Sequence, residues 1–528
     1  MTTPTVVSSP GKVLLAGGYL VLDPAYSGVV VSTSSRFYTV VSNSDKRAAG
    51  GESGVGTGNR VLEPLVQIRV RSPQFVNAAW AYALHLYSHN NGEDVSLRIE
   101  QVADGSTSNS RNKFVQLAIQ RTVALALELK GAEALKSGFG HDLEIVIVGD
   151  NDFYSQRQQL SSKNLPPTLA SLSQLPPFLP TGVIISDVHK TGLGSSAALI
   201  TSLVSALLLH LNVIPSESFN AEAGSSTTSE GRRLAHNLAQ YVHCLAQGKV
   251  GSGFDVSAAV FGSQIYTRFD PAVIQPLMTD EVAPGSLRKI LSPSNSAWNY
   301  KAEPFQLPPF VRLMLADVDA GSDTPSLVGK VLKWRQDNVV EAKELWNAIN
   351  KVNQSLSRDL LQLSDLAATH PSEYKKMIGY LSSVQTLQWL AHPETSAEER
   401  EIGEVFLRVR QTSEGIRAHM RRMGSLSGVP IEPPEQTQLL DACISVAGVI
   451  GGGVPGAGGY DAIWLLVFDP AEVPEGVKRP SERVETLWST WKGLDVSPLL
   501  ATESKEKGVR LEKLESIPGL KEAIHANN

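Results

Sequence analysis

Cysteine is scarce in this sequence, with only Cys244 and Cys443 among 528 residues. Neither has partners at a metal-binding spacing, so the sequence predicts no zinc site and no disulfide framework. We expect two buried thiols in a reducing, intracellular compartment. No apolar run reaches the roughly 20 residues that cross a bilayer. No basic segment precedes an apolar one at the start, so no signal peptide is predicted, and we expect a cytoplasmic protein.

An excess of positive charge is also absent. The 47 lysines and arginines face 53 acidic residues, which gives a net charge of −6. Without a basic patch, the sequence gives no reason to expect nucleic-acid binding. The length predicts two domains or one large two-lobed body, and the hydrophobic content of 42% is that of a globular protein. We expect a small-molecule partner, no membrane, and a monomer or homodimer.

Two common nucleotide signatures are missing as well. The GxxxxGK[ST] phosphate loop does not occur, and neither does the HRD and DFG pair of protein kinases. Proteins that use this phosphate loop are therefore excluded, and protein kinases are excluded too.

The sequence does contain a glycine turn that enters a long apolar helix. The run KTGLGSSAALITSLVSALLLHL spans residues 190–211, and the apolar segment 182–188 before it is predicted to be a strand. Gly192 and Gly194 allow the backbone to turn tightly and approach a ligand closely. The free N–H groups and the dipole of the helix start then favour an anion. This pattern is typical of a polyphosphate site.

Polar side chains around the turn strengthen that interpretation. Ser195 and Ser196 supply hydroxyls for phosphate or metal, and Lys190 supplies a mobile positive charge. A simple capped turn is the plainer alternative. With Ala197 the run also satisfies a dinucleotide-binding fingerprint, but such a turn belongs in the first unit of a repeating β-α-β chain, and this one lies about 190 residues in.

Two further glycine-framed clusters carry charged residues. SPGKVLLAGGYLVL places Lys12 and Tyr19 around tight turns near the start of the chain. GKVGSGFDVSAAVFG, residues 248–262, places Asp255 where a turn enters an apolar helix. Asp255 is either a helix cap or a carboxylate directed at the same pocket as Lys190.

Two more clusters lie in the second half. GGGVPGAGGYDA, residues 451–462, has more glycine than a connection needs, which favours backbone N–H groups that contact an anionic ligand. DAGSDTPSLVGKVLKW, residues 319–334, presents Ser322 and Thr324 at a helix start. Thr324 as a plain helix cap and a second phosphate site are both open.

Helices and strands mix without a regular repeat, so we predict an α+β fold. Apolar periodicity predicts helices at 74–88, 112–130, 232–247 and 325–358. The Pro-, Ser- and Asn-rich segment 280–308 predicts a boundary between an N-terminal domain, 1–290, and a C-terminal domain, 291–528. The polar stretches 42–60 and 216–231 are predicted surface loops without an assigned function.

Together, SPGKVLLAGGY, GLGSSAA and GVPGAGGYDA resemble the three motifs of the GHMP kinases, in the same order. With NDFYSQR at 151–157, the details are most similar to the phosphomevalonate kinases of the fungal type. The resemblance implies an N-terminal α+β domain with a left-handed β-α-β unit and a ferredoxin-like C-terminal domain. It implies transfer of phosphate from ATP, with Mg²⁺, to 5-phosphomevalonate, which yields 5-diphosphomevalonate for isoprenoid and sterol synthesis.

The resemblance also implies residue roles. Lys190 and Asp255 are expected to be catalytic, Asp255 either as a base or as an orienting group. ATP is expected to bind Gly192, Leu193, Gly194, Ser195, Ser196, Ala197 and Ala198. The acceptor is expected to bind Lys12, Tyr19, Ser322, Thr324, Gly456, Ala457, Gly458 and Gly459.

The expected metal shell differs from that of the related mevalonate kinases. Those enzymes place a magnesium-binding glutamate about three helical turns before the catalytic aspartate. The matching position here is near Cys244, with His243 beside it. Ser196 is therefore the expected protein ligand, completed by ATP oxygens and water.

Three other functions are compatible with the same clusters. Another GHMP kinase would use mevalonate or a sugar as acceptor. A decarboxylase that acts on diphosphomevalonate shares the fold. A catalytically silent sensor would bind ATP and a metabolite without turnover.

Overall fold

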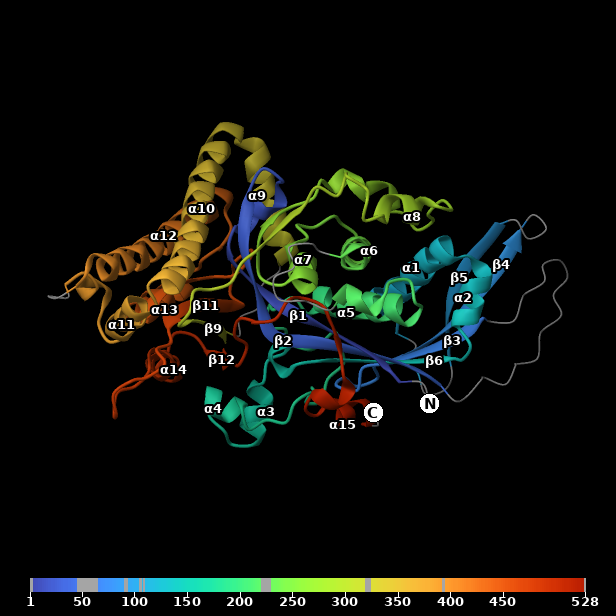
Figure 1. Ribbon diagram of the computed structural model, residues 1–528, viewed down its shortest axis with the longest axis horizontal. Helices are drawn as coiled ribbons and strands as arrows, with labels where there is room; N and C mark the ends of the chain where they lie inside the picture. The colour runs from blue at the N-terminus through green and yellow to red at the C-terminus, as the bar shows by residue number, and fades with distance from the viewer. Residues whose placement is uncertain are drawn as a thin grey trace.

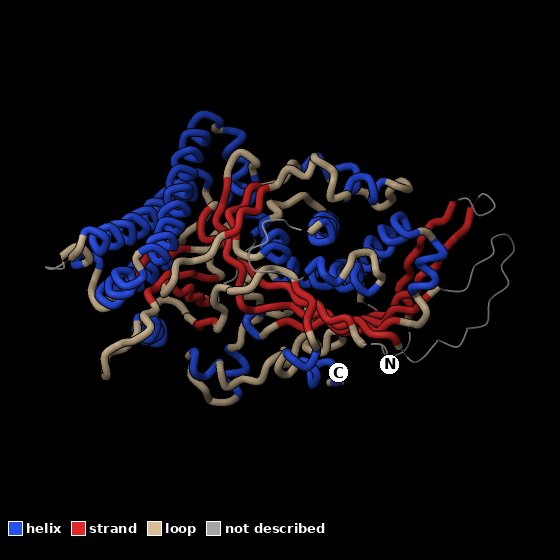
Figure 2. Tube along the Cα trace, in the orientation of Figure 1, coloured by secondary structure: helices blue, strands red, loops and turns tan. Residues whose placement is uncertain are grey.

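The computed structural model describes residues 3–44, 65–89, 94–103, 107, 110–219, 229–318, 324–391 and 395–526. Two sheets, with helices packed on them, form an elongated molecule (Figures 1 and 2). Within the described residues the larger sheet has nine strands and the smaller has four. This mixture of helices and sheets confirms the predicted α+β class.

The larger sheet runs in the order β13-β1-β2-β6-β3-β4-β5, and β7 joins β2 to β8. The long strands β1 and β2 pair along most of their length and form its centre. Its strands are β1 (Thr5–Ala16), β2 (Ser27–Asn43), β3 (Val66–Arg71), β4 (Ala79–His89), β5 (Asp94–Val102), β6 (Leu143–Gly149), β7 (Gln264–Thr267), β8 (Lys301–Pro304) and β13 (Arg510–Glu512).

Helices cover both faces of this sheet (Figure 1). One face carries α1 (Lys113–Lys130), α2 (Ala132–Gly138), α5 (Ser195–His210), α6 (Glu230–Gln247), α7 (Phe254–Phe261) and α8 (Ser286–Leu291). The other carries α3 (Arg157–Ser162) and α15 (Leu520–His525), while α4 (Leu169–Leu172) contacts β12 (Ser497–Leu499) of the smaller sheet. Helix α5 packs on β1 and β2 beneath α1, α6 and α7, which explains why it is apolar on nearly all sides.

The smaller sheet has the order β10-β11-β9-β12. Its strands are β9 (Val311–Asp317), β10 (Val449–Gly453), β11 (Ala462–Phe468) and β12 (Ser497–Leu499). All the pairs are antiparallel, and this order is that of a ferredoxin-like sheet. Its helices are α9 (Thr324–Asp337), α10 (Val339–Thr369), α11 (Pro371–Leu381), α12 (Ala397–Ser427), α13 (Pro434–Ile444) and α14 (Pro480–Thr490).

The end of the described chain returns to the larger sheet. β13 pairs with β1, and α15 packs Leu520 and Ile524 against its outer face. β8, which also follows residue 290, pairs with β7. The division at residue 290 and the handedness of the β-α-β unit stay predictions, and the larger sheet takes strands from both sides of that division.

Three predicted elements differ from the structure. The helix predicted at 74–88 is wrong, because residues 79–89 form β4. There, Trp80, Tyr82 and Leu84 alternate with small residues and pair with β3 on one side and β5 on the other. The strand predicted at 182–188 is wrong too, because this segment consists of turns. The helix predicted at 325–358 is interrupted at Asn338, between α9 and α10.

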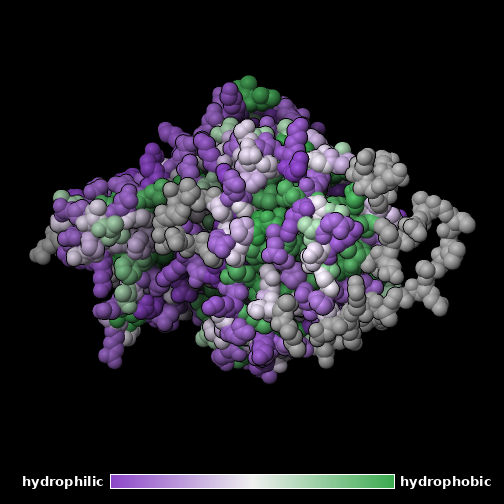
Figure 3. Space-filling model, turned by 45° about the vertical axis from the view of Figure 1, so that its right-hand side comes forward, coloured by the Kyte–Doolittle hydropathy of each residue, from purple (hydrophilic) through white to green (hydrophobic). Residues whose placement is uncertain are grey.

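The scarcity of cysteine predicted two buried thiols. Cys244 and Cys443 are free and buried, as predicted. Across the described ranges, every helix is too short or too polar to span a bilayer. The face in Figure 3 is largely hydrophilic, with hydrophobic residues gathered near its middle.

Asp150, directly after β6, predicts a pH-dependent stability. Burial raises the pKa of this carboxyl to about 7, although its Oδ2 accepts a 2.7 Å hydrogen bond from the Arg36 N–H. In the unfolded chain the pKa is about 3.9. The folded protein therefore holds a proton that the unfolded chain loses, and this stabilisation is lost as pH rises from about 4 to about 7.

We expect the Asp150→Asn variant to show a flatter decline in the free energy of unfolding over this pH range, by about 1 kcal/mol for each pH unit. Urea titrations of both proteins at pH 5, 6, 7 and 8 measure the difference. Parallel curves would show that Asp150 does not titrate in this way.

Candidate active site

The glycine turn before α5 leaves the start of the helix open. Gly192 and Gly194 have φ of 78° and 81°, in the left-handed region, and Gly194 occupies the cap position. No described side chain caps the helix there. The plainer alternative, a turn capped by its own serines, is therefore not what the structure has. The first N–H groups of α5 are left for a ligand, and an anion is favoured.

The loop is held from below by its own apolar residues. Leu193, Ala197 and Ala198 are at most 4% exposed and pack into the core. They therefore present backbone rather than side chains to a ligand.

Lys12 lies against this turn. Its Nζ donates a 2.7 Å hydrogen bond to the carbonyl of Gly192, and its N–H donates to the carbonyl of Leu193. An added Cβ at Gly194 would lie 2.9 Å from Lys12 Cε, so the glycine makes room for the lysine stem. Burial lowers the pKa of Lys12, while Asp255 and Asp461 act in the opposite direction.

A buried histidine connects the turn to Asp255. His243, on α6, is 3% exposed, and its Nε2 lies 3.1 Å from Ser196 Oγ and 3.8 Å from Asp255 Oδ2. The side-chain nitrogen of Gln247 lies 3.1 Å from the same atom. Burial lowers the pKa of His243, and Asp255 partly opposes the shift. The hydroxyl of Ser196 and the carboxylate of Asp255 thus both lie near one imidazole nitrogen.

Asp255 occupies the first turn of α7, which follows the left-handed Gly253. Its Oδ1 accepts a hydrogen bond from the N–H of Val256, and its side chain is 22% exposed. The predicted position at a helix start is confirmed, but the alternative that Asp255 is the helix cap is wrong, because Gly253 holds the cap position and no described side chain caps α7. The carboxylate lies 3.8 Å from His243 and attracts the Lys12 ammonium group.

The glycine-rich loop of the second half reaches the same place. Tyr19 follows β1 in a short 3-10 helix, Gly18–Leu22, and its hydroxyl donates a 2.7 Å hydrogen bond to the carbonyl of Ala457. Gly459 N–H donates to the carbonyl of Ile431 at 2.9 Å. An added Cβ at Gly458 would lie only 2.0 Å from that carbonyl oxygen, so the close approach requires glycine there.

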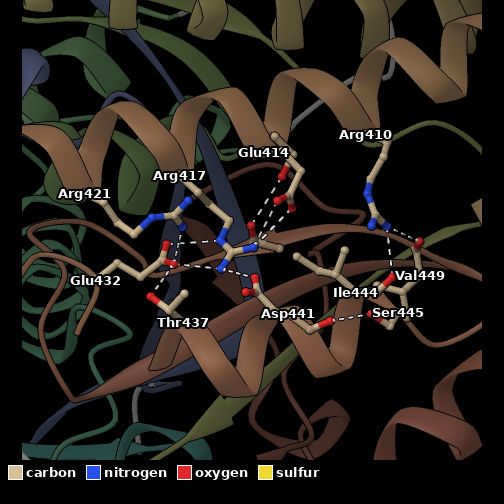
Figure 4. A network of polar contacts seen from close by, with 12 residues as sticks. Arg410, Glu414, Arg417, Arg421, Glu432, Thr437, Asp441, Ile444, Ser445 and Val449 are labelled. Atoms are coloured by element: carbon tan, nitrogen blue, oxygen red, sulfur yellow. Dashed lines mark hydrogen bonds and ion pairs between the residues drawn. The ribbon is translucent and has the colours of Figure 1, made fainter. Parts of the chain in front are cut away.

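Behind this loop lies a network of buried charges that links α12 to α13 (Figure 4). Arg417 on α12 is 3% exposed, and its guanidinium donates two hydrogen bonds to Glu432, at 3.1 and 2.7 Å. Arg421 and Thr437 donate to the same carboxylate. Burial alone would lower the pKa of Arg417, but Glu432 and its other acidic partners raise it. Glu432 follows Ile431 directly, so the network fixes the carbonyl that holds the loop.

Lys190 is held by its backbone beside this site. It forms an isolated β-bridge with Tyr154, and desolvation lowers the pKa of its ammonium group. The attraction of Asp255 acts on Lys12. The structure thus places Lys12, rather than Lys190, as the partner of the carboxylate.

Most of the predicted site residues come together. Lys12, Tyr19, the turn 192–198, Asp255 and the loop 456–459 surround one region. Ser322 and parts of the predicted polar loops lie outside the described residues, and Thr324 is the first residue of α9.

Sequence reasoning did not select His243 and Asp461. The histidine was visible only as the neighbour of the expected glutamate position. The aspartate was visible only as the acidic residue that follows the glycine loop.

Comparison with known proteins places these features in a family. The family model described as GHMP kinases C terminal matches residues 408–485. The peroxisomal phosphomevalonate kinase of Arabidopsis thaliana is 38% identical over 529 residues, 96% of each chain. The phosphomevalonate kinase of Aspergillus fumigatus is 35% identical over 98% of each chain.

Solved structures agree on the fold. The phosphomevalonate kinase of Streptococcus pneumoniae, in complex with phosphomevalonate and AMPPNP, has a TM-score of 0.54 at 15% identity and covers 95% of this chain and 99% of its own. A Listeria innocua protein has a TM-score of 0.58 at 15% identity, with 97% and 100% covered. Since the motifs and the identity extend over nearly the whole length, this chain belongs to the phosphomevalonate kinase family of the GHMP kinases.

Proposed function

We propose that this protein transfers the γ-phosphoryl group of ATP to 5-phosphomevalonate, which gives 5-diphosphomevalonate and ADP. One observation carries the proposal: Lys12, the open start of α5, Asp255 and the loop 456–459 meet at one place. The names of the relatives and the phosphomevalonate bound in the S. pneumoniae structure support the choice of substrate.

In this proposal the ATP phosphates lie on the N–H groups at the start of α5. An oxygen of the acceptor phosphate bonds to the γ-phosphorus, while the bond to the β,γ-bridging oxygen breaks and its electron pair leaves with ADP. Phosphoryl transfer depends mainly on positioning and charge neutralisation. Lys12 supplies a fixed positive charge at the loop, and Lys190 supplies a second one at its edge.

The acceptor needs little help to lose a proton. The second pKa of a phosphate monoester is about 6, so its oxygen is largely anionic at neutral pH. Asp255 therefore serves to hold Lys12 and to orient the reactants rather than as a strong base. The loop 456–459, with Tyr19 and the segment that contains Ser322 and Thr324, holds the acceptor.

The residues present fit a magnesium ion. Ser196 Oγ and the Asp255 carboxylate approach the same nitrogen of His243, so two oxygen donors lie close together. Mg²⁺ prefers oxygen ligands and keeps several waters, so few protein ligands suffice. In the described part of the chain, no group of three or more His, Cys, Asp or Glu side chains could hold a metal. Ser196 and Asp255 would therefore hold the ion together with phosphate oxygens and water, and the ion would supply positive charge against the phosphates.

We also propose a cytoplasmic location and a monomeric or homodimeric state. The Arabidopsis relative carries a peroxisomal name. Imaging of a fluorescently tagged chain in its own cells, with a peroxisomal marker, separates the two locations.

The reaction predicts one product and one preferred acceptor. We expect ATP with 5-phosphomevalonate to give two new diphosphate signals by phosphorus NMR, beyond those of ADP. A coupled ADP-release assay with mevalonate, galactose and diphosphomevalonate measures the other three functions. Turnover only with one of these, or ATP binding with no turnover, would contradict the proposal.

The two roles assigned to Lys12 and Asp255 predict unequal losses. We expect Lys12→Met to lower kcat by about 100- to 1000-fold, because a fixed charge at the transferring group is lost. Asp255→Asn is expected to lose about tenfold, because the acceptor is already anionic. Steady-state kinetics from pH 6 to 9 measure both. Equal losses, with a pH profile that requires an ionised carboxylate, would make Asp255 the base.

The network behind the loop predicts an effect on the acceptor alone. We expect Arg417→Met to raise the KM for phosphomevalonate about tenfold and to leave the KM for ATP within twofold, because Glu432 no longer fixes the turn at Ile431. The matched control is Arg408→Met, which breaks the 3.2 Å pair with the buried Asp359 between α10 and α12. If the two variants changed the KM values equally, the network would only stabilise the protein in general.

A further inference from the structure

The segment NDFYSQR, residues 151–157, supports the backbone on which Lys190 lies. Ser155 N–H donates a 3.0 Å hydrogen bond to the carbonyl of His189, and Thr191 N–H donates to the carbonyl of Phe153 at 3.3 Å. Tyr154 and Lys190 form the bridge between these contacts. The position of the Lys190 backbone is therefore set by this segment.

The same segment ends in an arginine that binds a buried carboxylate. Arg157 contacts Asp317 Oδ2 and donates a 2.8 Å hydrogen bond to the carbonyl of Asp317. It also donates a 2.7 Å hydrogen bond to the carbonyl of Asp495. His189 Nε2 lies 3.3 Å from the other oxygen of Asp317, whose side chain is 1% exposed. Arg157, which ends the supporting segment, and His189, which directly precedes Lys190, thus both contact the carboxylate of Asp317.

Asp317 belongs to the other half of the molecule. It ends β9 and pairs with Ala462, the first residue of β11, while the N–H of Val318 donates to the carbonyl of Asp461. Asp317 therefore lies where β9 leaves towards α9 and where the glycine-rich loop enters β11. A shift of Asp317 would move the Lys190 segment and this loop relative to each other.

We propose that Arg157, Asp317 and His189 form a positioning cluster that holds Lys190 in register with the acceptor loop. This inference rests on the proposed function. A carboxylate this deeply buried requires its cationic partner, since an unpaired charge in the interior is strongly unfavourable. The cluster thus makes one arrangement of the two halves much more stable than others. It acts through Lys190 and the loop, without contact with the reacting atoms.

The first test uses His189, whose side chain is 35% exposed and whose removal leaves Asp317 paired with Arg157. We expect His189→Ala to lower kcat about tenfold with the KM for ATP within twofold, because small misplacements of reacting groups are costly. His189→Gln, which keeps a hydrogen-bond donor, is expected to restore most of kcat. An unchanged kcat in His189→Ala, or no recovery in His189→Gln, would overturn the inference.

A double-mutant cycle separates positioning from general stability. We expect His189→Ala to change kcat by less than twofold, within about 0.4 kcal/mol, when Lys190 is already alanine, because the group that the cluster positions is gone. The same fold-loss in both backgrounds would overturn the inference.

Asp317→Asn extends the test, with Asp359→Asn as its control. The control also removes a buried carboxylate from an arginine, here Arg408 between α10 and α12. We expect both variants to lower the thermal midpoint, but only Asp317→Asn to lower kcat. Equal kcat in the two variants would overturn the inference. If the wild-type protein turns over phosphomevalonate and these variants have the same kcat, the cluster alone is contradicted. If the wild-type protein shows no turnover, the proposed function and the cluster are contradicted together.

Discussion

The contact between Lys12 and the glycine turn before α5 sets the geometry on which the site depends. The lysine stem lies against Gly194 and its ammonium group binds the carbonyl of Gly192, so β1 and the start of α5 are joined at one point. A side chain at position 194 would displace the lysine. A displaced lysine would lose the attraction of Asp255 and Asp461, the two carboxylates that oppose the lowering of its pKa by burial. The turn thus leaves the N–H groups at the start of α5 open and also supports the charge beside them.

This contact would be of little use without a fixed relation between the two sheets. Two contacts provide it from different directions. Tyr19 binds the carbonyl of Ala457, and Arg157 binds Asp317. Each joins residues that are far apart in the sequence, so the site forms only when both halves are folded and in contact. The Arg417 network adds stiffness within the second half, behind the loop that Tyr19 binds.

Much of the fold and of the site could be predicted because the informative residues are local. The glycine turn and apolar α5 form one continuous run, and Asp255 stands at a visible helix start. Where the prediction failed, contacts with residues that are distant in the sequence determined the structure. Residues 79–89 have helical periodicity, but β3 and β5 bind their backbone on both sides, so they form a strand. Residues 182–188 are apolar enough for a strand but have no partner strand among the described residues. His243 could not be selected, because only the packing of α6 against α5 and α7 brings it to Ser196 and Asp255.

The acceptor explains why the site is built from charge placement rather than from a strong base. Two phosphate groups must approach although both are anionic, so repulsion is the larger obstacle. The structure places the Lys12 ammonium group at the glycine turn, fixes the backbone of Lys190 close by in the chain and leaves the positive end of α5 without a side-chain cap. The Lys12 ammonium group is held by its hydrogen bond to Gly192 and the start of α5 is fixed by the fold, so little reorganisation of these two positive groups is needed at the moment of transfer. His243, buried between the hydroxyl of Ser196 and the carboxylate of Asp255, keeps the two oxygen donors close together without adding negative charge. In the proposed reaction two phosphate groups meet near this point, so a glutamate near Cys244, as the resemblance to mevalonate kinases would place it, would add a further negative charge there.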